Sequence, residues 1–369
     1  MTCSDASRER EFAELRNRPA ADMPFPRNAW YVAAGGPELG RELLGRKLLG
    51  QQVVLFRAED GTPVALSDWC PHRGFPLSKS KLIGDEIQCG YHGMRYDRTG
   101  GCVHVPTQSV IPKGLRVRSY PVVEKWLWVW IWMGDPEKAD PALIPHTGHE
   151  DKPYRHAFQF CYPMKGNFQL LHDNVMDITH LSFLHAGFGD NEDEKEILTA
   201  ESTIEADGRH VTRTWTMTNF IPDPPVAKTF SLEPGVAVDR TLIVDYFLPS
   251  LMVSVNRFTS VGDSSRVVSE HVGQIPITPA DHGESYHFFG ISTSYTPPMS
   301  PEEETAFSRY VIHQDAVAIE AVQQYFEQAG TDFREVTLRN DGVAMMGRRI
   351  VAEMVAAERA ALNAAPVPA

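Results

Sequence analysis

The sequence predicts an α+β protein in which a small all-β domain precedes a domain of helices and an antiparallel sheet. Short apolar runs between turn residues, from residue 28 to residue 134, indicate the first domain. In the second part, residues 167–185 have a helical pattern, alternating strands follow, and two helical patterns close the chain. A length of 369 residues, 42% of them apolar, is enough for two domains with cores of their own.

Residues 1–27 have the pattern of a polar helical lead-in, and the stretch MTCSDASREREFAEL lacks the apolar character of a signal peptide. The β domain, 28–134, contains the strand patterns WYVAA, QQVVLF and TPVALSDW. The most apolar run, WLWVWIWM at 126–133, is too short to span a bilayer. Its aromatic and β-branched residues are typical of a buried strand.

A polar stretch with several prolines, 135–153, predicts a linker between the domains. The second domain, 154–369, has alternating strand patterns such as HVTRTWTMTNF, RTLIVDYFL and YHFFGISTSY. Helical patterns near 302–328 and 342–361 end it. The acidic stretch 190–196 is typical of a solvated loop.

Charge and cysteine content exclude several classes of protein. The formal net charge of −13 argues against a nucleic-acid partner or an anionic membrane, which would require a basic surface. The five cysteines are sparse and odd in number, so they do not indicate a disulfide scaffold. A cytoplasmic protein is therefore expected.

Two short loops each carry one cysteine and one histidine. The pattern is Cys70-x-His72, then sixteen residues, then Cys89-x2-His92. A zinc finger usually has its cysteines in one loop and its histidines in another. A Rieske [2Fe–2S] cluster binds one iron through two thiolates and the other through two imidazoles, so it needs this mixed set.

The strings CPHRG and CGYHG resemble the fingerprint of Rieske domains, with Gly74 and Gly90 allowing tight turns. The resemblance implies that these two loops bind a [2Fe–2S] cluster that accepts electrons from a ferredoxin. A zinc site and a chance grouping of residues in a β domain are the alternatives.

A second group of polar residues lies in NVMDITHLSFLH, which contains Asn174, Asp177, His180 and His185. On a regular α-helix Asp177 and His180 lie about 60° apart, whereas His180 and His185 lie about 140° apart. Both histidines can face one metal only if the helix has a π-bulge or ends before His185. The alternative is an amphipathic helix with one exposed and one buried histidine.

This stretch resembles the N-x2-D-x2-H-x4-H motif of Rieske non-heme iron oxygenases. The resemblance implies a helix-grip catalytic domain in which His180, His185 and a carboxylate hold mononuclear Fe(II) and leave positions open for O2. In YVIHQDAVAIEAV the family pattern favours Asp315 as the carboxylate, with Glu320 as the alternative.

The same resemblance implies roles for two further residues. The carboxylate of Asp177 would accept a hydrogen bond from His180 and join it to His92 of the partner subunit in a homotrimer. Such a bond would also fix the tautomer of the imidazole. Asn174 would line the iron pocket.

In length and layout the chain is most similar to the vanillate O-demethylase, dicamba monooxygenase and chloroacetanilide N-dealkylase group. The resemblance implies a monooxygenase that removes an O- or N-alkyl group from an aromatic ether or anilide. A ring-hydroxylating dioxygenase and a Rieske electron-transfer protein without oxygenase activity are the alternatives. The chain has no GxGxxG motif and no plant-type ferredoxin spacing, so electrons from NAD(P)H are expected through a separate reductase and ferredoxin.

Two larger sets of residues are candidates for contacts with partners. Basic residues near the cluster loops could form a docking surface for an acidic ferredoxin: Arg73, Lys79, Lys81, Arg95 and Arg98. Residues of the second domain could line the substrate pocket: Phe168, Leu171, Phe183, Phe220, Phe247, Met252, Val255, Phe289 and Ile291, with His287 and Asn256 as polar members.

Overall fold

The structure is a computed structural model that describes residues 8–9, 11–12, 14–15, 23–185, 200–330 and 335–364. The chain divides into two compact units. The smaller unit is Arg27–Ile144 with Thr278–His282, and the larger is Met1–Pro26, Pro145–Ile277 and Gly283–Ala369. The acidic stretch 190–196 lies outside the described residues.

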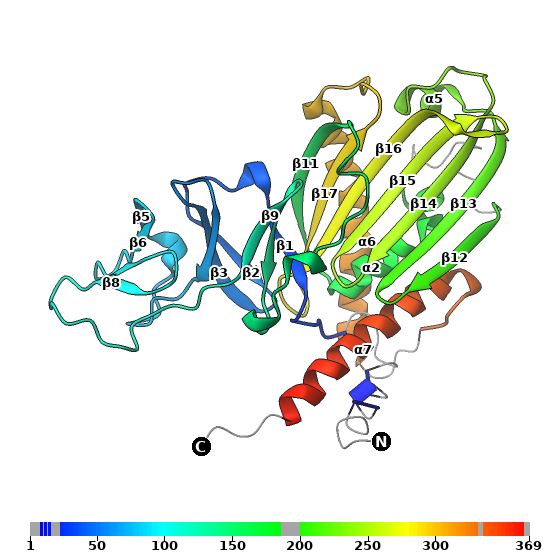
Figure 1. Ribbon diagram of the computed structural model, residues 1–369. Coiled ribbons are helices and arrows are strands. Elements are labelled where there is room, and N and C mark those ends of the chain that lie inside the picture. The colour runs from blue at the N-terminus through cyan, green and yellow to red at the C-terminus, as the bar shows by residue number, and fades with distance from the viewer. Residues whose placement is uncertain are drawn as a thin grey trace. The chain divides into compact units, whose positions relative to one another are not determined.

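The smaller unit contains three antiparallel sheets, with the orders β1–β10–β9, β2–β3–β4 and β5–β6–β7–β8 (Figure 1). Its strands are β1 (Trp30–Gly35), β2 (Leu44–Leu48), β3 (Gln51–Arg57), β4 (Pro63–Ser67), β5 (Lys81–Ile83), β6 (Glu86–Gln88), β7 (Arg95–Tyr96), β8 (Cys102–His104), β9 (Val122–Lys125) and β10 (Trp128–Trp132). Short 3-10 turns are η2 (Gly36–Glu38), η3 (Leu77–Lys79), η4 (Pro136–Lys138) and η5 (Pro141–Leu143). The all-β prediction is confirmed, and β10 is buried along its whole length.

The segment that the sequence suggests as a linker is partly structured. Its first half, up to Ile144, clusters with the smaller unit and contains η4 and η5. Indole N–H groups hold it in place, because Trp132 donates to the carbonyl of Asp135 and Trp30 donates to that of Asp140, both at 2.8 Å. Two prolines and two aspartate caps therefore mark short helical turns here rather than a free connection.

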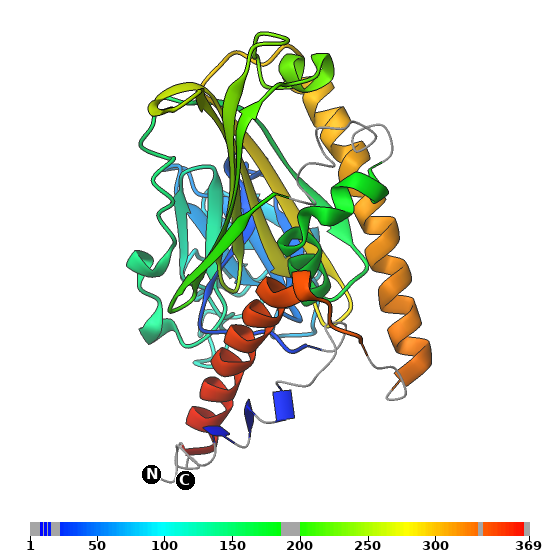
Figure 2. The same cartoon turned by 90° about the vertical axis from the view of Figure 1, so that its right-hand side faces the viewer.

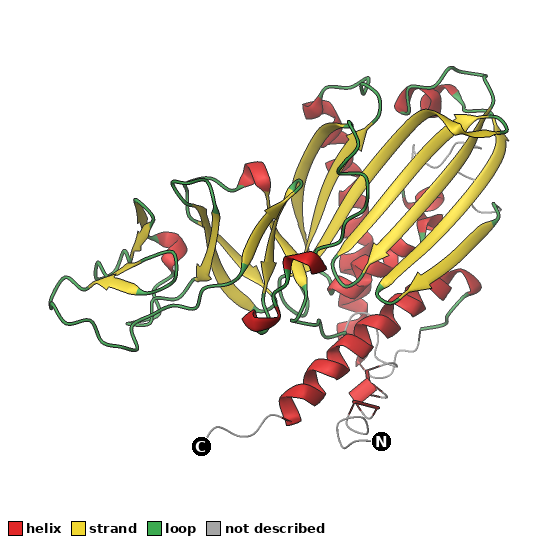
Figure 3. Ribbon diagram, in the orientation of Figure 1, coloured by secondary structure: helices red, strands yellow, loops and turns green. Residues whose placement is uncertain are grey.

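The larger unit is built on a seven-stranded antiparallel sheet of order β11–β17–β16–β15–β14–β13–β12 (Figure 3). The strands are β11 (Arg155–Met164), β12 (Ser202–Asp207), β13 (His210–Phe220), β14 (Val238–Phe247), β15 (Leu251–Ser260), β16 (Asp263–Pro279) and β17 (Ser285–Thr293). In β14 buried residues alternate strictly with half-buried ones, as expected for a strand with one face on the core.

Helices α2 and α6 lie on the same side of this sheet (Figure 2). The helical elements are α2 (Phe168–Met176), η6 (Ile178–His180), α3 (Leu181–Leu184), α5 (Pro224–Thr229), α6 (Pro301–Ala329), η8 (Arg339–Asp341) and α7 (Gly342–Ala364). Helix α6 is capped by Ser300, whose side chain accepts from the Glu303 amide while the Glu303 side chain accepts from the Ser300 amide. None of the helices in the described ranges is long and apolar enough to cross a membrane.

The described residues between 8 and 15 of the N-terminal lead-in are helical, and this part of the lead-in packs against the last helix. Leu15 is fully buried in a cluster with Ala352, Val355 and Ala356 of α7. Glu11 accepts from the Arg359 guanidinium at 3.4 Å. The lead-in thus belongs with the larger unit, although the chain enters the smaller unit directly after it.

Candidate metal centres

The two cysteine–histidine loops of the smaller unit have the same backbone turn. The Gly74 amide donates to the carbonyl of Cys70 at 2.8 Å, and the Gly93 amide donates to that of Cys89 at 2.9 Å. Both glycines have positive φ, 70° and 76°, which other residues adopt only with strain. The second turn therefore depends on Gly93, not on Gly90, the glycine that the sequence pattern suggested.

The four side chains of these loops divide into a buried pair and an exposed pair. Cys70 and Cys89 are 2% and 1% exposed. His72 and His92 are exposed, and their ring centroids lie 4.6 Å apart. The donor set fits a Rieske cluster, in which the two buried cysteines would hold one iron and the two exposed histidines the other.

Tyr96 is a further residue of this site that the sequence did not indicate. Its hydroxyl lies 3.2 Å from Sγ of Cys70, and its side chain is fully buried. A hydrogen bond to a cluster thiolate is one of the means by which a protein adjusts reduction potential. Tyr96 lies on β7, only a few residues from His92, but nothing in its own spacing distinguishes it from a core tyrosine.

In the larger unit, the chain leaves helical geometry at Asp177, before the first histidine, and again at His185. Helix α2 ends at Met176, Asp177 caps it in an extended conformation, and the turn η6 ends at His180. The short helix α3 then ends at Leu184, so His185 follows the helix with φ −92° and ψ 73°. The spacing left two alternatives, a π-bulge or a helix end before His185, and the structure has the helix end.

His180, His185 and Asp315 come together, with one ligand atom from each lying within 4.8 Å of the others. Oδ1 of Asp315 lies 3.4 Å from Nε2 of His180 and 3.5 Å from Nε2 of His185. Glu320 is directed elsewhere, since its Oε1 accepts from the Lys165 amide at 3.2 Å. Two imidazoles and one carboxylate in this arrangement fit the facial triad of Fe(II) oxygenases.

The charges of the triad favour a cation. Burial lowers the pKa of His180, but its contact with Asp315 outweighs burial and raises the pKa overall. Burial raises the pKa of Asp315, yet the two histidines outweigh it and hold that pKa below its usual value. A buried carboxylate that stays ionised is suited to hold a metal ion.

Each member of the triad is held by a neighbour. Nδ2 of Asn174 donates to Oδ1 of Asp315 at 3.1 Å, so Asn174 lies beside the triad. Nδ1 of His180 is hydrogen-bonded to the main-chain carbonyl of Asp177, and Nδ1 of His185 to Oε1 of Gln314 at 2.9 Å.

The expected bond between His180 and the carboxylate of Asp177 is not present. Oδ1 of Asp177 instead accepts from the amide and hydroxyl of Thr179, at 2.9 and 2.6 Å, and from Nδ2 of Asn340 at 2.6 Å. Asp177 caps the turn η6, and the cap directs its side chain along the backbone. The tautomer of His180 is thus fixed by the main chain.

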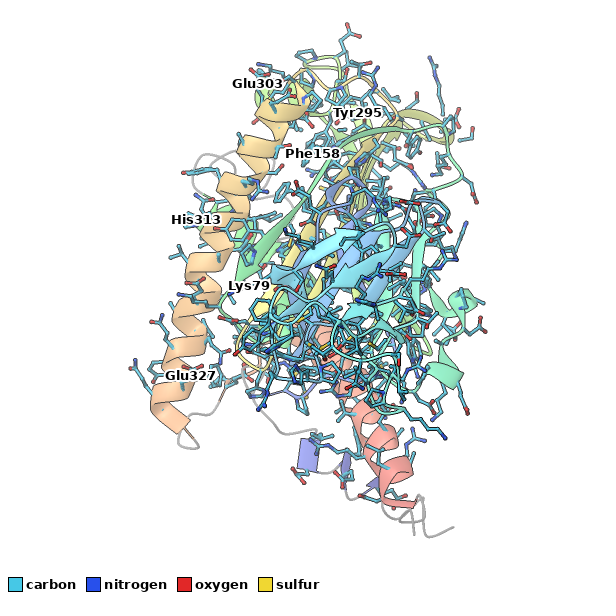
Figure 4. All side chains as sticks on the ribbon, turned by 90° about the vertical axis from the view of Figure 1, so that its left-hand side faces the viewer. Lys79, Phe158, Tyr295, Glu303, His313 and Glu327 are labelled. Carbon is cyan, nitrogen blue, oxygen red and sulfur yellow. The ribbon has the colours of Figure 1, made fainter. Side chains whose placement is uncertain are left out.

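A cavity of about 270 Å³ opens at the triad. Its lining residues come mainly from the sheet on one side and from α6 on the other. In Figure 4 these two elements can be found by the labels Glu303, His313 and Glu327 on α6 and Phe158 on β11. Five of the proposed pocket residues line it: Met252, Phe289, Ile291, His287 and Asn256. The others do not: Phe168, Leu171, Phe220 and Val255 are core residues, Phe183 is 78% exposed, and Phe247 stacks on His210.

Polar residues of the cavity wall went unnoticed in the sequence. Arg240 is 2% exposed, its Nη2 donates to Oδ1 of Asn256 at 3.0 Å, and its guanidinium lies over the ring of Phe220. His271 is opposite Asn256 on the adjacent strand. The alternation in VDRTLIVDYF places Arg240 on the same face as the buried Leu242. This alternation could have predicted from the sequence that Arg240 faces the interior.

Comparison with known proteins agrees with the two sites. Residues 29–121 match the Rieske [2Fe-2S] domain, and residues 164–357 match the vanillate O-demethylase oxygenase C-terminal domain. The chain is 32% identical to the dicamba O-demethylase oxygenase component of Stenotrophomonas maltophilia, over 92% of this chain and 100% of that protein. It is 30% identical to a vanillate O-demethylase oxygenase subunit of a Pseudomonas species, over 92% and 98%.

The fold is similar to the crystal structure of dicamba monooxygenase bound to dicamba. The TM-score is 0.80 at 30% identity, over 93% of this chain and all of that one. The two family matches include the cluster loops and the residues of the triad. The chain therefore belongs to the Rieske non-heme iron oxygenases of the vanillate O-demethylase type, oxygenase components that use a [2Fe–2S] cluster, non-heme iron and O2.

Proposed function

We propose that this oxygenase removes an O- or N-alkyl group from a small aromatic ether or anilide. We assign the cluster to Cys70, His72, Cys89 and His92. The triad of His180, His185 and Asp315 would hold the mononuclear iron. The observation that supports this most directly is a triad that lines a largely apolar cavity of about 270 Å³, which is large enough for a single substituted ring.

Iron bound by the triad would supply the activation of O2. One oxygen atom of O2 enters the alkyl carbon next to the ether oxygen or amide nitrogen, and the other leaves as water, with two electrons and two protons. The hydroxylated carbon then loses its bond to the heteroatom, which takes a proton. The products are an aldehyde and the dealkylated aromatic compound.

The chain's own residues hold the substrate and keep water away. Phe158 and Phe289, whose ring centroids lie 6.1 Å apart, offer aromatic surfaces to a substrate ring. Asn256 and His271 offer hydrogen-bonding groups at neighbouring positions of β15 and β16. Burial lowers the pKa of His271 to about 4, so near neutral pH it would meet a substrate as an uncharged imidazole.

A substrate screen tests the proposed reaction. The oxygenase is combined with a surrogate ferredoxin and reductase, and methoxylated aromatics and N-alkoxyalkyl anilides are supplied with NADH. Aldehyde release in proportion to O2 consumed is the expected result. A hydroxylated ring without aldehyde would show that the enzyme is a ring hydroxylase. An iron content of two per chain, the cluster iron alone, would indicate an electron carrier instead.

The cluster assignment predicts a change of potential in His92→Cys. An anionic thiolate would replace a neutral imidazole, so the reduction potential should fall by on the order of 100 mV or more, or the cluster should be lost. His92 is exposed, so the fold should tolerate the change. His104→Cys is the matched control, since His104 is an exposed histidine of the same unit. An unchanged potential and visible spectrum in His92→Cys would contradict the assignment.

We further propose that a ferredoxin docks near the cluster loops through Arg73, Lys79 and Lys81. These side chains are exposed. The two other predicted members are already paired, Arg95 with Glu86 at 2.9 Å and Arg98 with Asp60 at 2.8 Å, so the expected basic patch is smaller. Reduction by ferredoxin should slow with rising ionic strength and in Lys81→Ala, but hardly in Arg98→Ala. A rate independent of salt would count against this surface.

We also propose a homotrimer in which Asp177 contacts His92 of the partner subunit. Support comes from the carboxylate of Asp177, which in the described part of the chain accepts three hydrogen bonds, all at Oδ1. Oδ2 is therefore available, and Asp177 and His180 line a surface hollow of about 260 Å³. A cytoplasmic location is supported by Cys102, a cysteine outside the proposed cluster that forms no disulfide.

A further inference from the structure

The ring of His185 is held between two consecutive residues of α6. Its Nδ1 lies 2.9 Å from Oε1 of Gln314, and its Nε2 lies 3.5 Å from Oδ1 of Asp315. The imidazole is 2% exposed, and Gln314 is half-buried. The two ring nitrogens thus have different partners, and of the two it is Nε2 that lies next to Asp315.

The identity of these partners determines which nitrogen carries the proton. A carboxamide oxygen can only accept, so Nδ1 of His185 donates and Nε2 keeps its lone pair for a metal. Nε2 of Gln314 donates instead to the Tyr310 hydroxyl, at 3.4 Å. Oε1 is therefore the atom that remains for His185.

His180 has the same arrangement with a different acceptor. Its Nδ1 is bonded to the main-chain carbonyl of Asp177, and its Nε2 faces Asp315 at 3.4 Å. No side-chain replacement removes that carbonyl. The acceptor on His185 belongs to a side chain, so this half of the arrangement can be tested by substitution.

We propose that Gln314 is a positioning residue that fixes the ring orientation and tautomer of His185 for iron binding. The inference rests on the proposed ligand set of His180, His185 and Asp315. Because Gln314 and Asp315 are adjacent in α6, one turn of this helix would supply one ligand and orient another. Any sliding or rotation of α6 would then disturb two ligands at once.

Iron affinity, measured without substrate, tests the role. Gln314→Leu removes the acceptor at nearly constant size, and Fe(II) binding at the mononuclear site should weaken about 10- to 100-fold. Gln314→Glu keeps an acceptor oxygen and should bind iron nearly as the wild type does. Gln324→Leu is the matched control, because it makes the same change at an exposed position of α6. Affinities are obtained by titration against a competing chelator, with the cluster intact.

A spectroscopic readout separates positioning from general loosening of the fold. The EPR signal of the nitric oxide adduct of the bound iron should change its rhombicity in Gln314→Leu and keep it in Gln314→Glu and Gln324→Leu. Equal iron affinity in Gln314→Leu and wild type would overturn the inference, as would equal losses in Gln314→Leu and Gln314→Glu. His185→Ala tells the two proposals apart: if it retains full iron binding, the ligand set itself is wrong.

Discussion

Replacing Asp315 by alanine is expected to remove one iron per chain and to abolish turnover, while the visible absorption of the Rieske cluster stays unchanged. Asp315 is the single carboxylate whose oxygen lies close to Nε2 of both His180 and His185 in the described part of the chain. Without it, two neutral imidazoles must hold a divalent cation, and the site loses its negative charge. Turnover should fall by more than about 100-fold, beyond what the loss of a residue that merely supports a ligand costs.

The control for this experiment is Glu320→Ala. Glu320 is the other acidic residue in that part of α6, but its carboxylate accepts from the Lys165 amide. It should therefore keep iron and activity. Iron is counted by a colorimetric assay together with the cluster absorption. Full activity in Asp315→Ala with loss of activity in Glu320→Ala would reverse the choice of carboxylate.

The second large effect is expected for Asp177→Asn. Asparagine keeps an oxygen at the position of Oδ1, so the bonds from Thr179 and Asn340 can persist, and His180 keeps its main-chain partner. Both metal centres should remain. The replacement removes the charge of Oδ2, the atom proposed to accept from His92 of the partner subunit. Electron transfer to the mononuclear iron should nearly cease, measured as reoxidation of the reduced cluster by O2 in single turnover.

Mixed trimers make the same prediction in a second form. Subunits with Cys89→Ala lack the cluster, and subunits with His180→Ala lack the mononuclear iron, so neither kind is active alone. A hybrid should recover part of the activity, because an intact cluster and an intact iron meet across some of its interfaces. Well-folded hybrids without activity would contradict the route between subunits but leave the ligand assignments intact.

Local patterns in the sequence were enough to predict the fold class and most of the candidate site. The cluster residues lie within two short loops, so their spacing along the chain carries nearly all of their geometry. The five-residue separation of His180 and His185 likewise indicated a helix end before His185, which η6 and α3 provide. Chain geometry over a few residues is fixed by backbone dihedrals, and sequence spacing reports it directly.

The position of Asp315 was partly encoded as well. It lies in the buried stripe of α6 with Ile312, Ala316 and Ile319, at helical spacings of three, four and seven residues. Glu320, eight residues after Ile312, has a spacing that also fits this stripe, so periodicity alone does not separate the two carboxylates. That this stripe faces the two histidines, however, depends on how α6 packs against α2 and β11.

Only the tertiary structure decided the remaining features. The turn Thr278–His282 joins the smaller unit because the amides of Leu49 and Gly50 donate to the carbonyls of Pro279 and Ala280. The carboxylate of Asp177 was expected to accept a hydrogen bond from His180, but it caps η6 instead. Nδ1 of His185 is hydrogen-bonded to the side chain of Gln314. Some of these contacts join residues far apart in the chain, and others depend on which of several nearby groups forms the hydrogen bond. Long-range packing and competition among polar groups determine these contacts. A periodic pattern of apolar residues therefore does not predict them.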